Sequence, residues 1–294
     1  MVCNDCPRQC NIDRSIKSGY CNVTDSIKVA RAALHYWEEP CISGTEGSGA
    51  VFFSGCNMHC VFCQNSRISD GKTGEEITTE RLAEIFIELQ AQRANNINLV
   101  TPSHYVNQII DAVNVSRAKG LSIPIVYNSS SYEKKETLRR LKGYVDVYLP
   151  DCKYYDDELA TAFSHAPNYH SISLEAIAEM LDQVGEPVFD NRQMIVRGVI
   201  VRVLVLPGHT KDAQHVLASL YDRFGNRILY SVMNQYTPLV HVEDYPELNR
   251  KLTKREYKKV IDYALGLGIE NGFMQEGDVA KESFIPNFDL TGVK

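Results

Sequence analysis

The sequence predicts an α/β fold that is built from six consecutive strand–helix repeats. Short apolar runs alternate along the chain with segments whose apolar residues recur at helical spacing. The strands are apolar at nearly every position, as strands buried on both faces of a parallel sheet are. Because right-handed crossovers join such strands, the chain forms either a barrel or an open wound sheet.

The predicted strands lie between residues 50 and 233. They span residues 50–54, 97–101, 123–127, 145–149, 199–206 and 228–233. Apolar residues spaced three and four apart predict a helix after each of the first five strands. After the sixth strand, residues 253–256 form a capping-box sequence that precedes an apolar helix face, which predicts a packing extension.

Composition divides the chain into three parts. Residues 1–49 form a Cys-rich N-terminal extension that ends in a Ser/Gly-rich stretch, residues 50–240 form the core, and residues 241–294 form a C-terminal helical extension. The net charge of −6 disfavours a nucleic-acid binder. The apolar runs are too short to cross a bilayer, and no signal segment opens the chain, so the cytoplasm is the predicted compartment.

Nine cysteines occur in the chain, and seven fall into two groups. An odd count, close spacing and the absence of a signal segment favour metal binding over disulfides. Cys41 and Cys152 stand alone and are predicted to be structural thiols. The grouped cysteines are Cys3, Cys6, Cys10 and Cys21, and then Cys56, Cys60 and Cys63.

The second cysteine group follows the first core strand directly. Iron–sulfur clusters are held by thiolates, usually four. Three cysteines in one loop would leave one iron of a cubane without a protein ligand, and a substrate or cofactor can then chelate that iron. The alternative is a zinc site with His59 as the fourth ligand. Zinc ribbons use a second cysteine pair, which is missing here, and this favours iron–sulfur.

The spacing Cys-x3-Cys-x-Phe-Cys after the first strand resembles the signature of the radical S-adenosylmethionine (SAM) superfamily. The continuation Gln64-Asn65 is similar to that of activating enzymes for glycyl-radical enzymes, such as pyruvate formate-lyase activating enzyme. The resemblance covers roughly residues 50–240. It implies a partial (β/α)6 barrel of the TIM type, a [4Fe–4S] cluster on Cys56, Cys60 and Cys63, and SAM bound to the open iron. It also implies a 5′-deoxyadenosyl radical that abstracts hydrogen, and a flavodoxin or ferredoxin as reductant.

Further site residues follow from the resemblance one at a time. Phe62 lies at the aromatic position beside the adenine, and Asn128-Ser129-Ser130 resembles a segment that approaches the ribose, which implies ligand contacts from Asn128 and Ser130. A core aromatic and a turn are the alternatives for these two segments.

Three charged residues at the fourth and fifth strands resemble SAM-binding positions: Asp151 and Lys153 would hold the methionyl end or a cation beside it, and Arg202 would reach the carboxylate or the ribose of SAM. Asp151 and Lys153 form an Asp-x-Lys motif, for which a surface ion pair is the alternative. Arg202 lies inside an apolar strand and needs a partner if it is buried, either SAM or a carboxylate such as Asp151.

The end of the second strand departs from the family pattern. A Gly-Gly-Glu-like segment that contacts the methionyl amine is replaced by Thr101-Pro102-Ser103. The hydroxyls of Thr101 and Ser103 are candidate replacements, and a helix N-cap at Ser103 is the alternative. Gln235 and Tyr236, after the sixth strand, are expected at the substrate end.

The amino-terminal group Cys3-x2-Cys6-x3-Cys10-x10-Cys21 has the spacing of a metal site. Zinc and an auxiliary iron–sulfur cluster are both chemically sensible, and reduced thiols without metal are the alternative. Similar segments occur in poorly characterised activase-like radical SAM proteins.

Three functions are compatible with the sequence. The first is reductive cleavage of SAM, with hydrogen abstraction from a glycyl-radical enzyme as the partner. The second is the same radical chemistry on a peptide or small molecule. The third is a non-catalytic, zinc-stabilised binding module.

Overall fold

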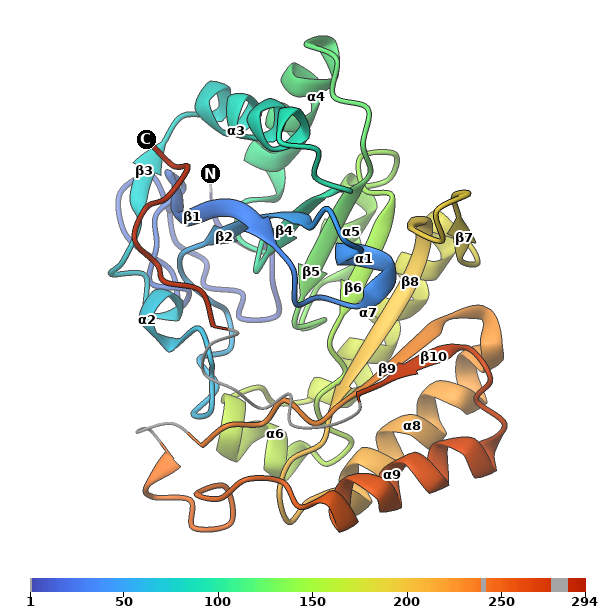
Figure 1. Cartoon of the computed structure of the whole chain (residues 1–294). Coiled ribbons are helices and arrows are strands. Elements are labelled where there is room, and N and C mark those ends of the chain that lie inside the picture. Colours follow the sequence, from blue (N-terminus) through green and yellow to red (C-terminus); the bar gives the residue numbers. More distant parts are fainter. Residues whose placement is uncertain (1, 239–241, 276–284) are drawn as a thin grey trace.

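The computed structural model describes residues 2–238, 242–275 and 285–294. One curved sheet organises them, with the strand order β10-β9-β8-β6-β5-β4-β2-β1-β3, and β10 and β3 end this order, so the barrel is partial (Figure 1). The six predicted strands are confirmed, and each pairs in parallel with the next. They are β2 (Ser48–Phe53), β4 (Ile97–Val100), β5 (Ile125–Ser129), β6 (Val147–Pro150), β8 (Ile195–Leu204) and β9 (Leu229–Met233).

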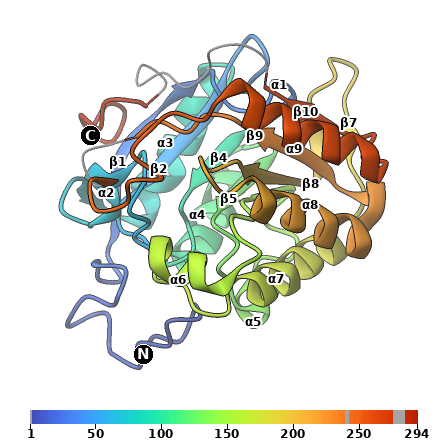
Figure 2. The same cartoon turned by 90° about the horizontal axis from the view of Figure 1, so that it is seen from below.

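Helices cover the outer side of the parallel strands (Figure 2). Their buried faces carry the predicted apolar residues, and a continuous core fills the space between helices and sheet. The helices that follow the first five core strands are confirmed. They are α3 (Thr79–Ala91), α4 (Val106–Ala118), α5 (Lys135–Arg140), α7 (Tyr169–Val184) and α8 (Thr210–Phe224), to which the structure adds α6 (Asp157–Ser164) and the single turns α1 (Pro40–Ser43), α2 (Ser66–Ser69) and η1 (Gly225–Arg227).

The sheet continues beyond the six repeats at β2. Strand β1 (Ile27–His35) pairs antiparallel with β2, and β3 (Glu75–Ile77) pairs antiparallel with β1. Residues 288–294 lie against β1, where the Leu290 amide donates to Ala30 O and the Ala32 amide donates to Thr291 O. The amino-terminal extension therefore contributes a strand to the main sheet. The division of the chain at residue 49 stays a prediction, and the second boundary, at residues 240–241, touches residues that the structure does not describe.

The carboxyl-terminal helix forms as predicted. Helix α9 (Lys254–Leu267) starts at a capping box in which the Glu256 amide donates to Thr253 Oγ1 and the Thr253 amide donates to Glu256 Oε2. The short strand β10 (Gly272–Met274) then pairs in parallel with β9, and β7 (Val188–Phe189) pairs antiparallel with β8. None of the helices in the described ranges is long and apolar enough to cross a membrane.

Candidate active site

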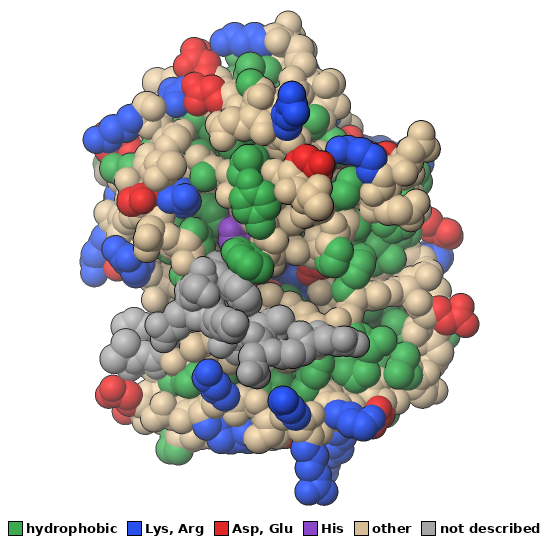
Figure 3. Space-filling view, viewed as in Figure 1, with side chains coloured by type: hydrophobic (Ala, Val, Ile, Leu, Met, Phe, Trp, Pro, Cys, Tyr) green, Lys and Arg blue, Asp and Glu red, His purple; other side chains and the backbone are tan. Residues whose placement is uncertain are grey.

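A cavity lies at the carboxyl ends of the parallel strands, where barrels and wound sheets place their binding sites. In Figure 3, blue and red atoms are visible inside a hollow that green apolar side chains border. Ten of the residues predicted to hold a cluster or SAM line this cavity. They are Cys56, Phe62, Cys60, Cys63, Thr101, Asn128, Ser130, Asp151, Lys153 and Arg202.

The cysteine loop leaves β2 through a close contact with the amino-terminal segment. Gly55 has a φ of +89°, and a Cβ there would lie 2.6 Å from Cys21 O. Only glycine fits this backbone and this approach. The Cys56 amide donates to the same carbonyl of Cys21 at 3.3 Å, and the Asn57 side chain donates to Tyr132 O at 2.8 Å. The loop is thus fixed before any ligand binds.

The three thiols of this loop are free and half-buried. The Met58 amide donates to Cys56 Sγ at 3.4 Å, and Ser164 Oγ donates to Cys60 Sγ at 2.9 Å. Burial raises the pKa of Cys60 to about 11 and that of Cys63 to about 12. Cys60 and Cys63 are therefore protonated at neutral pH until a metal binds and displaces the protons. Three thiols on one wall, with donors already directed at two of the sulfurs, fit a cluster that keeps one iron open.

His59 does not fit the alternative zinc site through its Nε2 atom. That nitrogen lies 2.9 Å from Tyr20 O, so it carries a proton and donates to this carbonyl. Across the described parts of the chain, no three Cys, His, Asp or Glu side chains gather closely enough to hold a single metal ion. A cubane differs from such a site, because its thiolate ligands bind different irons.

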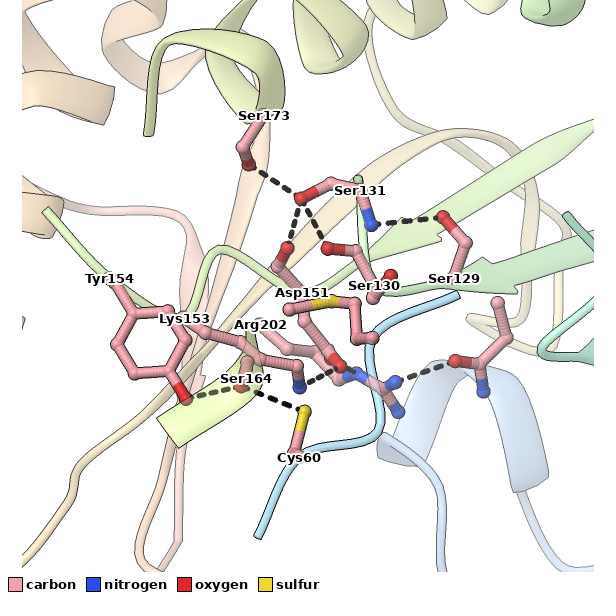
Figure 4. A network of polar contacts seen from close by, with 12 residues as sticks. Cys60, Ser129, Ser130, Ser131, Asp151, Lys153, Tyr154, Ser164, Ser173 and Arg202 are labelled. Carbon is pink, nitrogen blue, oxygen red and sulfur yellow. Dashed lines mark hydrogen bonds and ion pairs between the residues drawn. The ribbon is translucent and has the colours of Figure 1, made fainter. Parts of the chain in front are cut away.

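Beside Cys60, charged side chains of alternating sign form a network (Figure 4). Arg202 Nε donates to Asp151 Oδ1 at 2.7 Å, and Lys153 Nζ donates to Asp151 Oδ2 at 2.5 Å. Arg202 also donates through Nη2 to Asn128 Oδ1 at 2.6 Å. The ion pair of Asp151 with Arg202 that the sequence left open is thus present, and it lies on the wall of the cavity rather than away from it.

Glu38 is a charged residue of the cavity that the sequence did not predict. Its Oε2 accepts from Arg202 Nη1 at 3.1 Å, and its Oε1 accepts from Asn98 Nδ2 at 3.1 Å. Glu38 follows β1, and the pairing of β1 with β2 brings it to the cavity. Its only signal in the sequence was a pair of acidic residues after an apolar run, which is compatible with a solvent-exposed turn.

Two opposing effects set the pKa values of the network: burial disfavours the charged form of each side chain, and pairing with an opposite charge favours it. Burial alone would raise the pKa of Asp151, but the charges of Arg202 and Lys153 outweigh it and hold that pKa below its ordinary value. For Glu38 burial prevails over the charge of Arg202, so its pKa is raised. Burial would lower the pKa of Lys153, but Asp151 and Cys60 raise it. The network therefore holds ion pairs whose members all face the cavity.

Thr101 lines the cavity with a backbone φ of +59°, a left-handed conformation that is rare for a β-branched residue. Ser103 does not line it. The Ser103 side chain is buried and donates to Glu133 Oε1, so its predicted contact with the methionyl amine is not what the geometry supports. Tyr236 is also buried, where its hydroxyl donates to Leu248 O, whereas Gln235 lines the cavity as expected.

The cysteines outside the loop lie in different parts of the fold. Cys41 and Cys152 are buried thiols, and burial raises the pKa of each to about 12. The four amino-terminal cysteines lie outside the cavity, beside the base of the cysteine loop.

Comparison with known proteins decides the family. The family model of the radical SAM superfamily matches residues 50–220, which include the cysteine loop and the charged residues of β6 and β8. The chain belongs to the radical SAM superfamily. Membership implies a [4Fe–4S] cluster and SAM, and the three thiols and the alternating charges fit these two groups.

This radical SAM protein is similar to a sequence relative and to several solved structures, all at low sequence identity. An uncharacterized protein of Methanocaldococcus jannaschii, MJ0674, is 29% identical over 271 residues, covering 89% of this chain and 74% of that protein. The structure of Streptococcus suis SuiB bound to S-adenosylmethionine superposes with a TM-score of 0.52 at 14% identity. That match covers 76% of this chain and 48% of SuiB, so the chain spans about half its length. Methylornithine synthase PylB superposes with a TM-score of 0.51 at 15% identity, over 74% of this chain and 63% of PylB.

Proposed function

We propose that this protein cleaves SAM reductively and uses the resulting radical to abstract hydrogen from a glycyl-radical enzyme. One observation carries the proposal. Three free thiols and a set of largely buried ion pairs line the same cavity at the carboxyl ends of the strands. The thiols suit a cluster with one open iron, and the ion pairs suit a zwitterionic amino-acid end beside it.

Cys56, Cys60 and Cys63 would hold the cluster. When bound, it supplies the electron that breaks a carbon–sulfur bond of SAM and releases a 5′-deoxyadenosyl radical. Lys153 contributes a cation on the Cys60 side of the cavity, where its charge favours the thiolate form of that ligand.

The charged network would hold the methionyl end of SAM. The carboxylates of Glu38 and Asp151 are available to accept from its amine, and Arg202 and Lys153 are available to donate to its carboxylate. In this arrangement Glu38 supplies the acidic group that the segment 101–103 lacks. The carboxylates and cations are equal in number, so a zwitterion enters without leaving an unpaired buried charge.

Neutral residues of the same wall would position the nucleoside. Asn128 holds an amide within the cavity that both donates and accepts, as a ribose diol requires, and Ser130 lies next to it on the chain. Phe62 presents an almost fully buried ring between two cluster ligands, a place suited to the adenine.

The hydrogen donor is proposed to be a backbone glycine of a partner enzyme. The Gln64-Asn65 continuation and the Asp151-x-Lys153 motif, which are shared with glycyl-radical activating enzymes, support this choice. Gln64 lies at the cavity, where its side chain donates to Gln235 O at 2.6 Å. Exposed Trp37 also lines the cavity, which provides an apolar rim for a polypeptide segment.

The test is anaerobic reconstitution with iron and sulfide, followed by reduction with SAM present. Release of 5′-deoxyadenosine by the wild type and its loss in Cys60→Ala, with Cys41→Ala as the matched control, supports the proposal. A Cys60→Ala protein that still cleaves SAM overturns it. For the partner, addition of a glycyl-radical enzyme should produce the doublet signal of a glycyl radical in electron paramagnetic resonance (EPR) spectra. SAM cleavage without that signal would instead favour modification of a peptide or small molecule.

A further inference from the structure

The four amino-terminal cysteines gather in one place. A Cβ at Gly19 would lie 3.5 Å from Cys10 Sγ and 3.6 Å from Cys21 Sγ, so both sulfurs face the same point. The Cys3 amide donates to Ile12 O, and the Asn11 amide donates to Cys3 O, which holds Cys3 beside the chain on either side of Cys10. A turn joins Cys6 to Cys10, because the Gln9 amide donates to Cys6 O. The four cysteines therefore lie in one folded segment of the chain.

The backbone around these cysteines is shaped to present sulfur. The Tyr20 amide donates to Cys10 Sγ at 3.3 Å, and the Gln9 amide donates to Cys6 O at 3.1 Å to close a turn. Gln9, Asn11 and Asn22, which flank Cys10 and follow Cys21, have φ values of +45°, +52° and +63°. Left-handed backbone is uncommon at residues other than glycine, although asparagine adopts it more readily. These residues turn the chain on both sides of Cys10 and after Cys21.

The spacing favours an iron–sulfur cluster over zinc. Three cysteines lie within eight residues and the fourth is distant, as in ferredoxin-type patterns, whereas zinc ribbons use two close pairs. Within the described residues the thiols do not converge on a single ion. The Cys56 loop shares this property, and there the family implies a cluster.

The two cysteine groups meet through direct contacts. Cys21 O accepts from the Cys56 amide at 3.3 Å, and Tyr20 O accepts from His59 Nε2 at 2.9 Å. Arg8 bridges the same two segments, because its Nε donates to Asn57 O at 2.7 Å and its guanidinium stacks 3.9 Å from the Tyr20 ring centroid. Cys3, Cys6 and Cys10 are partly exposed and Cys21 is buried against the loop, so the group has an outer and an inner side.

We propose that Cys3, Cys6, Cys10 and Cys21 hold a second iron–sulfur cluster that relays electrons to the cluster on the Cys56 loop. The inference rests on the proposed SAM cleavage. A low-potential protein of the flavodoxin or ferredoxin class gives up one electron to the outer side of the relay. The same electron passes on and is consumed when one carbon–sulfur bond of SAM breaks, giving methionine and the 5′-deoxyadenosyl radical.

Two reciprocal variants test the site itself. In Cys56→Ala/Cys60→Ala/Cys63→Ala the second site is intact, and in Cys6→Ala/Cys10→Ala the SAM site is intact. After anaerobic reconstitution we expect about eight irons in the wild type and about four in each variant, with a reducible cluster visible by EPR in both. Cys41→Ala, a buried thiol outside both groups, should retain the full iron content.

The metal that remains in the Cys56-loop variant decides the outcome even if the other variant folds poorly. One zinc per chain, or no metal, at the amino-terminal cysteines overturns the proposal. For the relay, stopped-flow reduction by flavodoxin should be slower in Cys6→Ala/Cys10→Ala, while SAM cleavage driven by dithionite is retained. Reduction by flavodoxin at the wild-type rate overturns the relay. Failure of the proposed function is distinct, because the wild type would then release no 5′-deoxyadenosine with any reductant.

Discussion

Substitution of Glu38 by glutamine tests the assignment of the charged wall. Glutamine keeps the size of the side chain and keeps an oxygen that accepts from Asn98 and Asn128. It removes the carboxylate that pairs with Arg202 at 3.1 Å and that would receive the methionyl amine of SAM. A hydrogen bond to a charged group contributes about 1.5–3 kcal/mol. We therefore expect SAM to bind about 10- to 100-fold more weakly to Glu38→Gln, since about 1.4 kcal/mol corresponds to a tenfold change.

Glu39→Gln is the matched control. Glu39 is the next residue, is also buried and also interacts with Arg202, but it does not line the cavity. The assay is isothermal titration of SAM into anaerobically reconstituted protein, with iron content and unfolding midpoint measured on the same samples. Unchanged affinity in Glu38→Gln, or an equal loss in both variants, would refute the assignment of Glu38 to the ligand. A loss of iron together with affinity would point to disturbance of the cysteine loop instead.

Further predictions concern stability and pH. Burial raises the pKa of Glu133 from 4.5 to about 7, so the folded state retains a proton that the unfolded state releases, and stability should fall as pH rises from about 4.5 to 7. The shift corresponds to about 3 kcal/mol of stability. Glu133→Gln should remove most of this pH dependence when urea unfolding is compared at pH 5 and pH 8. An equal change in the free energy of unfolding between the two pH values in both proteins would contradict the prediction. Thr101→Gly should raise the free energy of unfolding by about 1 kcal/mol, because the backbone strain of a threonine with a φ of +59° exceeds the entropy that glycine adds to the unfolded chain. A decrease in that free energy would show that the left-handed backbone of Thr101 carries no strain. Phe86→Ala, in the fully buried face of α3, should lower the same free energy by about 3–5 kcal/mol in denaturant titrations, and a loss below 1 kcal/mol would contradict the core described above.

The parallel core was predictable because its signal is local. Each apolar strand is followed by helical spacing, and both periods can be read within a dozen residues. Strand β1 escaped prediction because Ile27–His35 interrupts its apolar residues with Lys28 and Arg31, and its partner is a strand more than twelve residues away. Strand β10 has three residues and forms only by pairing with β9, so its sequence carries no periodicity of its own.

The residues of the site likewise fall into those that the local sequence predicts and those that depend on distant parts of the chain. The residues of the cysteine loop and of the strand ends lie on the predicted repeats, and the barrel geometry brings them together at one edge. The contact predicted for Ser103 stays a prediction, and the sequence did not indicate that this side chain is buried and donates to Glu133, which lies thirty residues further along the chain. Glu38 was missed because an antiparallel pairing, not the repeat, carries it to the cavity.

Glu38 also explains how a chain without the Gly-Gly-Glu-like segment can keep an acidic group at the same cavity. A carboxylate buried alone would be protonated, since burial raises its pKa. The guanidinium of Arg202 partly offsets the rise in the pKa of Glu38. At Asp151 the charges of Arg202 and Lys153 together outweigh burial and lower the pKa. The two carboxylates and the two cations thus stabilise one another's charged forms in a site where their side chains are largely buried. Arg202 acts on both carboxylates because β8 places its guanidinium between Glu38 and Asp151.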